Sequence, residues 1–477
     1  MIYIYIDSKL NCYIKQIKYT FKSIFRILGI TYKFINSFKD ISEKDIVINY
    51  GRNIKNKNFI NIQNGCLFSE MYLTLKSIKF ESLKRYDNIP VIYQYGTEDP
   101  YINYEKYIIT NIDIVQSIFF MLTRYEEVLL FDKIKRDKYG RFPESETLAY
   151  KEKFLDIPIV DVYIEFFMQF INYFDSDIKK NNLWGKNEFV ALITHDVDTP
   201  FKYVYNLDKD IVRAKYLRFD IIKDIYLHTL SLVDYKYDEF YTFNYIRKIE
   251  KKYNIKSAFY FMSGGNSIYD NYYSLKDYRI RSLIEYLEKD GCELGYHYSF
   301  SAFNDFEMMR EEKEKLDEYL INKNYGGRNH YLRFKSPDTW RIAEKNNILY
   351  DTTLGYSNYL GFRCGTCNAY KVFDIKKNNE LNLWEIPLTV MDISLVGENN
   401  ISLIEKNSMI QINKYINIVK KYNGIFVLLW HNSSLKNSNW KKGKNVFNKT
   451  LECLYNNNAK FMTGIEIVNK LEDYKNE

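Results

Sequence analysis

The second half of the chain alternates short apolar runs with amphipathic stretches, and this rhythm limits the fold more than any other feature. Segments with helical periodicity, such as 274–291 and 303–321, separate several of the apolar runs. Strands alternating with helices form a parallel sheet, open or closed, and about seven strands over about 290 residues favour a barrel-like domain. The predicted strands are FVALITHD (189–196), SAFYFM (257–262), CELGYH (292–297), HYLRF (330–334), LWEIPLTV (383–390), IFVLLWH (425–431) and KFMTGIEIV (460–468).

The first part of the chain has a different organisation. Residues 1–110 alternate β-like runs (IYIYI, DIVINY and PVIYQY) with helical stretches, and amphipathic helices are predicted at 111–131 and 157–175. The polar segment 176–186 (SDIKKNNLWGK) is the predicted boundary, and 477 residues are enough for more than one domain. We therefore expect an N-terminal α/β domain of unknown function at 1–180 and a second domain at 187–477.

Composition excludes several classes of protein. Hydrophobic residues make up 46% of the chain, which is enough to bury a full core, so a disordered chain is not expected. The net charge of +7 comes from cations interspersed with acids, which argues against a nucleic-acid partner. The most apolar helix is interrupted by Arg124, Glu126 and Glu127, so no integral membrane span is predicted. The N-terminus lacks signal-peptide features, and six cysteines without an export signal favour reduced thiols and a cytoplasmic location.

Chemically active side chains cluster where the predicted strands end. Asp196 and Asp198 share one face of a strand, because side chains at i and i+2 do so. Two carboxylates this close repel each other unless a cation or a proton lies between them, so one suits a metal and the other a base. The alternative is a helix cap beside a solvated carboxylate. Three of the five histidines also end apolar strands: His195, His297 and His431.

Other candidate residues carry a weaker signal. Arg333, in HYLRF, would orient nearby carboxylates if it is buried, and is otherwise a surface cation. The single C-x-x-C pair, Cys364 and Cys367, lacks the second pair of a zinc site and is interpreted as a turn. In the first domain, the segments 124–127 and 140–143 are interpreted as structural, or as contacts between domains.

Together these segments resemble the polysaccharide deacetylase family (carbohydrate esterase family 4, the chitooligosaccharide deacetylase homology domain). The order THDVD, GYHYSFS, LRFKSPDTW and LLWHN is similar to the order of that family's motifs, and SAFYFM and YDTTLGY resemble two more of its segments. The resemblance covers roughly 187–477. It implies a distorted (β/α) barrel of about seven strands, with the N-terminal α/β domain as an addition found in a bacterial subgroup.

The resemblance also implies roles for individual residues. Asp196 corresponds to the catalytic base, Arg333 to the arginine that holds the base, and His431 to the acid that protonates the leaving amine. Asp198 and His297 correspond to ligands of a divalent metal, most often zinc.

One position departs from the family pattern. Ser301 stands where the second metal histidine belongs, and a hydroxyl is a poor zinc ligand. His330 or His195 would then supply a third ligand, although strand alternation places His195 on the face opposite Asp196. Otherwise the site binds metal weakly, uses water ligands or has lost hydrolysis.

Two functions follow from these interpretations. The first is a metal-dependent hydrolase that removes N-acetyl groups from a sugar or polysaccharide precursor, so that an N-acetylated glycan is the expected partner. The second is a degenerate deacetylase that binds glycan or scaffolds polysaccharide assembly without catalysis.

Overall fold

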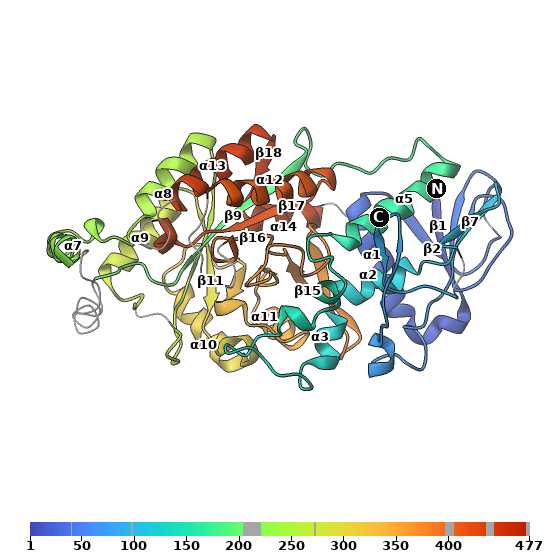
Figure 1. The fold of residues 1–477 in the computed structure, drawn as a ribbon, viewed down its shortest axis with the longest axis horizontal. Helices are drawn as coiled ribbons and strands as arrows, with labels where there is room; N and C mark the ends of the chain where they lie inside the picture. The colour runs from blue at the N-terminus through green and yellow to red at the C-terminus, as the bar shows by residue number, and fades with distance from the viewer. Residues whose placement is uncertain are drawn as a thin grey trace.

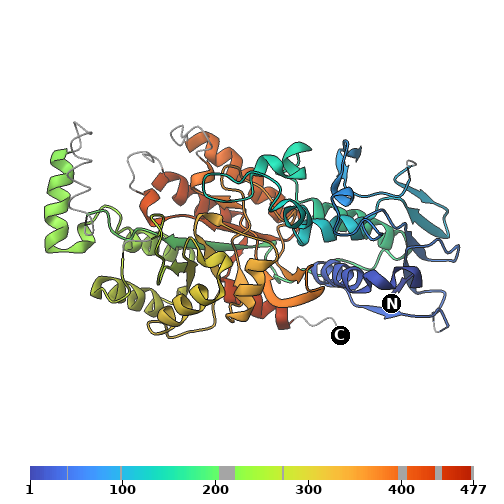
Figure 2. The same ribbon diagram turned by 90° about the horizontal axis from the view of Figure 1, so that it is seen from below.

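The computed structural model describes residues 1–39, 41–96, 99–203, 221–270, 273–395, 405–435 and 443–473. Two sheets divide the chain into an N-terminal region, residues 1–180, and a C-terminal region, residues 187–477. Figure 1 shows these regions side by side along the long axis of an elongated molecule, and Figure 2 shows the same arrangement from below.

The N-terminal region contains a six-stranded sheet with the order β2-β1-β3-β4-β8-β7. All neighbouring strands are parallel except β7, which runs antiparallel to β8. The bounds are β1 Ile2–Ile6, β2 Tyr32–Ile35, β3 Ile46–Tyr50, β4 Phe59–Ile62, β7 Tyr101–Asn103 and β8 Tyr107–Thr110, with a separate hairpin of β5 Lys84–Tyr86 and β6 Ile89–Val91.

The helices of this region lie where the apolar periodicity predicts them, with one break. The predicted helix at 111–131 is two helices, because Arg124 adopts a left-handed backbone with φ 53°. Asp113 caps the first of them, since its Oδ1 accepts the amide of Gln116 at 2.9 Å. The bounds are α1 Ile14–Leu28, α2 Ile114–Leu122, α3 Tyr125–Leu130, α4 Leu148–Lys151 and α5 Ile159–Phe174.

The C-terminal region is a curled (β/α) barrel, as the strand rhythm predicted. Its sheet has the order β14-β15-β13-β12-β11-β10-β9-β17-β16, with β18 also paired to β9, and every pair is parallel except β14 with β15. Within the described residues no pairing joins β14 to β16, so the barrel is open there. The bounds are β9 Phe189–Val197, β10 Ala258–Phe261, β11 Glu293–Tyr298, β12 Gly327–Asn329, β13 Tyr350–Asp351, β14 Tyr370–Asp374, β15 Asn379–Glu385, β16 Val390–Met391, β17 Ile425–Leu429 and β18 Ala459–Phe461.

Helices cover this sheet and separate its parallel strands. For example, α9 packs on β11, α11 on β15 and α12 on β17. None of the described helices of the chain is long and apolar enough to cross a membrane. The bounds are α7 Ile221–Val233, α8 Phe243–Glu250, α9 Tyr278–Lys289, α10 Phe306–Asp317, α11 Asp338–Lys345, α12 Glu405–Lys421, α13 Gly443–Asn456 and α14 Gly464–Asp473.

Three predicted strands differ from the structure in position or extent. The strand assigned to 383–390 is the end of β15, which stops at Glu385, and the start of β16 at Val390, with no strand between them. The strand assigned to 330–334 is β12, which ends at Asn329, and a 3-10 turn (η7) follows at His330–Leu332. The strand assigned to 460–468 ends at Phe461, because a capping box begins α14: the Thr463 amide donates to Glu466 Oε2 at 2.9 Å and the Glu466 amide donates to Thr463 Oγ1 at 3.3 Å.

The two regions share one continuous hydrophobic core. In Figure 1 α1 and α2 lie between the N-terminal sheet and the C-terminal region, and both contact β14. The buried Tyr19 hydroxyl of α1 donates to the carbonyl of Lys371 in β14 at 2.8 Å. The N-terminal region therefore packs directly on the barrel.

Candidate metal and catalytic site

The strand order brings the predicted site residues to one edge of the barrel sheet. Strands β12, β11, β10, β9 and β17 are consecutive neighbours and parallel, so their carboxyl ends meet at the same edge. Side chains at or just after these ends converge: Asp196, Asp198, His297, His330 and His431.

Asp198, His297 and His330 form the one group of three or more potential metal ligands found among the described residues. Their ligand atoms all lie within 4.8 Å of one another. Asp198 Oδ1 is 3.0 Å from His297 Nε2 and 3.7 Å from His330 Nε2. The site thus brings together the two ligands expected from sequence and His330, one of the two alternatives for the third.

Two atoms at the centre of this group are buried without a hydrogen-bond partner. Asp198 Oδ1 and His297 Nε2 face each other but lack hydrogen-bond geometry. Burial alone would raise the pKa of Asp198, but the surrounding imidazoles of His330, His297 and His431 outweigh it and hold that pKa well below its usual range. An ionised carboxylate oxygen beside two imidazole nitrogens is a donor set that suits a divalent cation such as zinc.

The ring of His297 is oriented by a hydrogen bond on its far side. Its Nδ1 lies 2.9 Å from the carbonyl oxygen of Arg328, which only accepts, so Nδ1 carries the proton. This tautomer leaves a lone pair on Nε2, the atom that faces Asp198. Such a hydrogen bond behind a ligating histidine is typical of metal sites.

Asp196 is held by Arg328, not by Arg333 as the sequence analysis expected. Arg328 Nη1 donates to Asp196 Oδ1 at 2.8 Å and to Thr194 Oγ1 at 2.9 Å, while its Nε donates to the carbonyl of Thr352 at 3.0 Å. Arg328 and Asp196 are both buried. This fork fixes one oxygen of Asp196 inside the barrel.

Arg333 lies elsewhere because the strand ends before it. Its guanidinium covers the rings of Phe300 at 3.8 Å and Phe303 at 4.2 Å, and it donates to the Phe300 carbonyl. The signal that identifies Arg328 was present in the sequence: Arg328 and His330 are two residues apart, the spacing that places Asp196 and Asp198 on one face.

His431 is paired with a carboxylate that the sequence analysis missed. Its Nδ1 lies 2.8 Å from Asp392 Oδ1, and its backbone amide donates to Asp392 Oδ2 at 2.8 Å. Burial lowers the pKa of His431, but the Asp392 carboxylate outweighs this and raises the pKa to about 10. His431 Nε2 faces the site, 3.5 Å from Asp198 Oδ2. Asp392 directly follows β16. In the sequence, an acidic residue directly after an apolar run was the pattern that could have identified it as a site residue.

The remaining candidates lie outside the site. His195 is on the opposite face of β9, with Nε2 3.0 Å from Glu250 Oε1 and Nδ1 2.6 Å from the Trp430 carbonyl oxygen. Ser301 begins the 3-10 turn Ala302–Asn304 (η6) after β11 and is not in the ligand group. Cys364 and Cys367 are buried free thiols.

One family model matches the first part of the chain. Residues 3–176 match the model of a family of unknown function (DUF7033). No curated protein matches the chain.

Solved structures resemble the chain distantly. A polysaccharide deacetylase from Mycobacterium smegmatis aligns with a TM-score of 0.41 and 14% identity over 61% of this chain and 92% of that one. Puue allantoinase aligns with a TM-score of 0.39 and 12% identity over 62% of this chain and 93% of that one. A polysaccharide deacetylase from Pseudomonas aeruginosa PAO1 aligns with a TM-score of 0.39 and 13% identity over 61% of this chain and 92% of that one.

Proposed function

We propose that the chain is a metal-dependent hydrolase that removes N-acetyl groups from a sugar or polysaccharide precursor. The observation that carries the proposal is the pair of unpartnered buried atoms, Asp198 Oδ1 and His297 Nε2, with His330 Nε2 beside them. The substrate class rests on the motif resemblance at the strand ends (THDVD, GYHYSFS and LLWHN).

The donor set fits a divalent metal, and zinc is the ion we expect. Asp198, His297 and His330 would hold it through one carboxylate oxygen and two imidazole nitrogens, the ligand types and number of many catalytic zinc sites. A metal held there would polarise the acetamide carbonyl and lower the pKa of water.

In this proposal Asp196 acts as the general base. Arg328 donates to its Oδ1 and orients the carboxylate, so its second oxygen is available to accept a proton from the attacking water. Asp196 Oδ2 lies 3.8 Å from His297 Nδ1, so the base is a neighbour of one residue of the ligand group.

In this proposal His431 acts as the general acid. Asp392 binds its Nδ1 and favours the protonated imidazole, and Nε2 faces the ligand group. A proton on Nε2 can therefore be transferred to the amine that leaves when the amide C–N bond breaks. The base and the acid thus each contact a residue of the ligand group: Asp196 lies beside His297, and His431 lies beside Asp198.

The alternative function, glycan binding without catalysis, rested on Ser301. His330 lies where a third ligand is needed, and Asp196 with its arginine and His431 with its carboxylate accompany it. A protein that only binds glycan has no use for this combination, so the geometry favours hydrolysis.

Metal content and amine release test the proposal together. Wild type, Asp198→Ala and His297→Ala are purified and reloaded with zinc, and metal per chain is measured beside free amine released from N-acetylated oligosaccharides. We expect one metal and activity in the wild type and loss of both in the two variants. A folded, metal-loaded wild type that releases no amine from any N-acetylated sugar contradicts the proposal. Glycan binding that persists in the inactive variants supports the alternative.

A further inference from the structure

The backbone that follows His330 is strained. Tyr331 and Leu332 adopt left-handed conformations, with φ 58° and 54°. Residues with side chains rarely adopt this region, and each costs on the order of 1 kcal/mol or more. Two such residues in succession persist only if the surroundings hold them, and they set the path of the backbone directly after His330.

In the N-terminal region, the turn 137–141 holds the side chain of Arg141 in one orientation. Asp137 Oδ1 accepts the amides of Tyr139 at 2.9 Å and Arg141 at 2.8 Å, and its Oδ2 binds Arg141 Nε at 2.6 Å. Gly140 has φ 75°, which favours glycine. The side chain of Arg141 is only 14% exposed. The turn 137–141 thus orients the guanidinium through its own carboxylate.

This turn contacts the strained residues directly. Arg141 Nη1 donates to the carbonyl of Tyr331 at 3.3 Å, and the ring centroids of Tyr139 and Tyr331 are 4.5 Å apart. The Tyr331 ring lies at the same centroid distance, 4.5 Å, from the His330 imidazole. Gly140 also fits closely, since a Cβ there would lie 3.0 Å from Arg333 Nη2.

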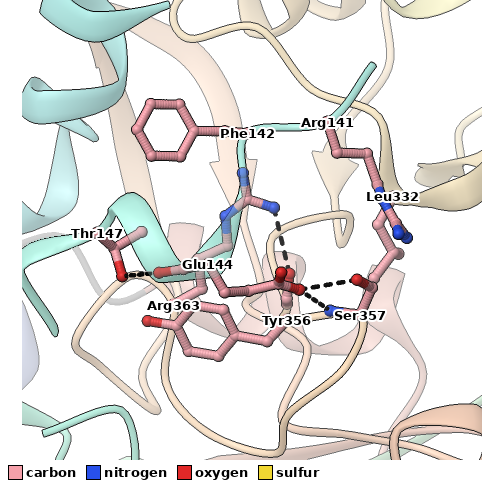
Figure 3. Close-up of a pocket in the computed structure, with 9 residues that line it drawn as sticks. Arg141, Phe142, Glu144, Thr147, Leu332, Tyr356, Ser357 and Arg363 are labelled. Atoms are coloured by element: carbon pink, nitrogen blue, oxygen red, sulfur yellow. Dashed lines mark hydrogen bonds between the residues drawn. The ribbon is translucent and has the colours of Figure 1, made fainter. Parts of the chain in front are cut away.

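The segment after the turn is anchored to the C-terminal region. Phe142 is buried, and Glu144 Oε1 accepts the amide of Ser357 at 2.9 Å and its hydroxyl at 2.7 Å. Figure 3 shows Glu144 and Ser357 directed at each other across a small pocket, with Arg141 beside Leu332 on another side of it. The turn therefore cannot move away from the His330 backbone without breaking these contacts.

We propose that the turn 137–141 is a positioning element of the metal site: Arg141 holds the Tyr331 carbonyl and so aims His330 at Asp198. The proposal rests on the metal site of the proposed function. It gives the N-terminal region, which matches a family of unknown function, a role in metal affinity.

Zinc affinity in a double-mutant cycle tests the inference. Dissociation constants are measured by chelator competition for wild type, Arg141→Ala, His330→Ala and the double variant. Lys135→Ala is the matched control, since it removes an exposed positive charge a few residues away. Removing a group that orients a metal ligand weakens metal binding by about 10–100-fold. We expect that loss for Arg141→Ala and less than about a twofold change for the control, with circular dichroism confirming that each variant folds.

The cycle separates positioning from general damage. In the His330→Ala background, Arg141→Ala should have no further effect on zinc affinity, because the residue that it positions is gone. Wild-type affinity in Arg141→Ala, or an equal loss in both backgrounds, overturns the inference. A wild type that binds no zinc overturns the proposed function instead.

Amide hydrogen exchange decides the inference independently of metal. The Arg333 amide donates to the His330 carbonyl at 3.3 Å and so reports on this turn. In metal-free protein, the exchange of this amide should be at least about tenfold faster in Arg141→Ala than in wild type or Lys135→Ala, because an amide is protected from exchange only while its local structure stays closed. Unchanged exchange overturns the proposed positioning role.

Discussion

Two clusters of buried charge in this chain differ in how completely they are paired. The first, here called the inter-region cluster, consists of Arg124, Glu127 and Arg363 and joins the N-terminal region to the barrel. Glu127 Oε1 accepts from Arg124 Nη2 at 2.9 Å and from Arg363 Nε at 3.1 Å, and its Oε2 accepts from Arg363 Nη2 at 3.0 Å. The second is the group of Asp198, His297 and His330, whose central atoms have no hydrogen-bond partner.

The difference distinguishes charged groups that stabilise the fold by pairing with one another from charged groups that are suited to bind a ligand. In the inter-region cluster, burial alone would raise the pKa of Glu127, but the two guanidiniums lower it to about 2, so the charges satisfy one another. An unpartnered buried polar atom, in contrast, carries a desolvation penalty that native proteins accept mainly where a ligand or chemistry compensates for it. The variants below test that distinction.

The largest expected effect is on catalysis and follows the replacement of Asp196 by Asn. The amide cannot accept a proton from water but keeps an oxygen for Arg328, so kcat should fall by about 100–10,000-fold, the usual contribution of a general base. Zinc affinity should stay within about threefold of wild type, because Asp196 is not in the ligand group. Deacetylation kinetics and chelator competition on one preparation measure both quantities. Loss of zinc together with activity would make Asp196 a ligand.

The next largest effect is on stability and follows Glu127→Ala. Removing the shared carboxylate leaves Arg363 buried without this counter-charge and Arg124 with only Glu126, at 3.7 Å, and breaking such a buried pair costs about 3–5 kcal/mol of unfolding free energy. Urea denaturation of metal-free protein measures this loss of unfolding free energy. Glu146→Ala, which removes one partner of an exposed ion pair, is the control and should lose less than about 1 kcal/mol. Metal per chain should not change in either variant. A loss below about 1 kcal/mol for Glu127→Ala would mean that the paired cluster does not hold the regions together.

The sequence predicted the barrel, and it predicted which side chains would converge at the strand ends in most cases, because both follow from local patterns. Each apolar run that ends in Asp196, His297 or His431 predicts a strand and, at the end of that strand, a candidate site residue. Strand alternation also separated His195 from Asp196 correctly, since it depends only on the twofold repeat of a strand.

The errors arose where tertiary contacts override local preference. The polar strand β12 (Gly327–Asn329) is stabilised by its neighbours β11 and β13, whereas the more apolar HYLRF suggested a strand that Tyr331 and Leu332 exclude by their left-handed backbone. Asp392 contacts His431, and the turn 137–141 contacts Tyr331, from distant parts of the chain, and a single sequence contains no periodic signal for such contacts.

A smaller effect, on pH dependence, is expected from Glu126 at the edge of the inter-region cluster. Burial raises the pKa of Glu126 from 4.5 to about 7, although Arg124 partly opposes the shift. Because the folded pKa is the higher one, the stabilisation is complete below about pH 4.5 and is lost as pH rises through about 7. Glu126→Gln keeps an acceptor for the Leu148 amide without the ionisation, so it should remove up to about 3 kcal/mol of this loss.

Urea denaturation at a series of pH values from about 5 to 8, the window set by this shift, checks the prediction. The difference in unfolding free energy between Glu126→Gln and wild type should grow with pH in the variant's favour. The same pH dependence in both proteins would show that Glu126 ionises without cost, and that this part of the cluster is as well paired as Glu127.

The smallest effect is expected at Ser301, the residue that departs from the family pattern. If His330 supplies the third ligand, the Ser301 hydroxyl contributes nothing to metal binding, and Ser301→Ala should change zinc affinity by less than about twofold. His330→Ala, which removes an imidazole from the ligand group, should weaken it by at least about 100-fold, since a direct ligand contributes more than the 10–100-fold of the groups that orient it. Chelator competition on the two variants decides between the positions. A tenfold loss in Ser301→Ala with little loss in His330→Ala would move the third ligand to the η6 turn, and the unpartnered atoms of Asp198 and His297 would then have to be completed from that side.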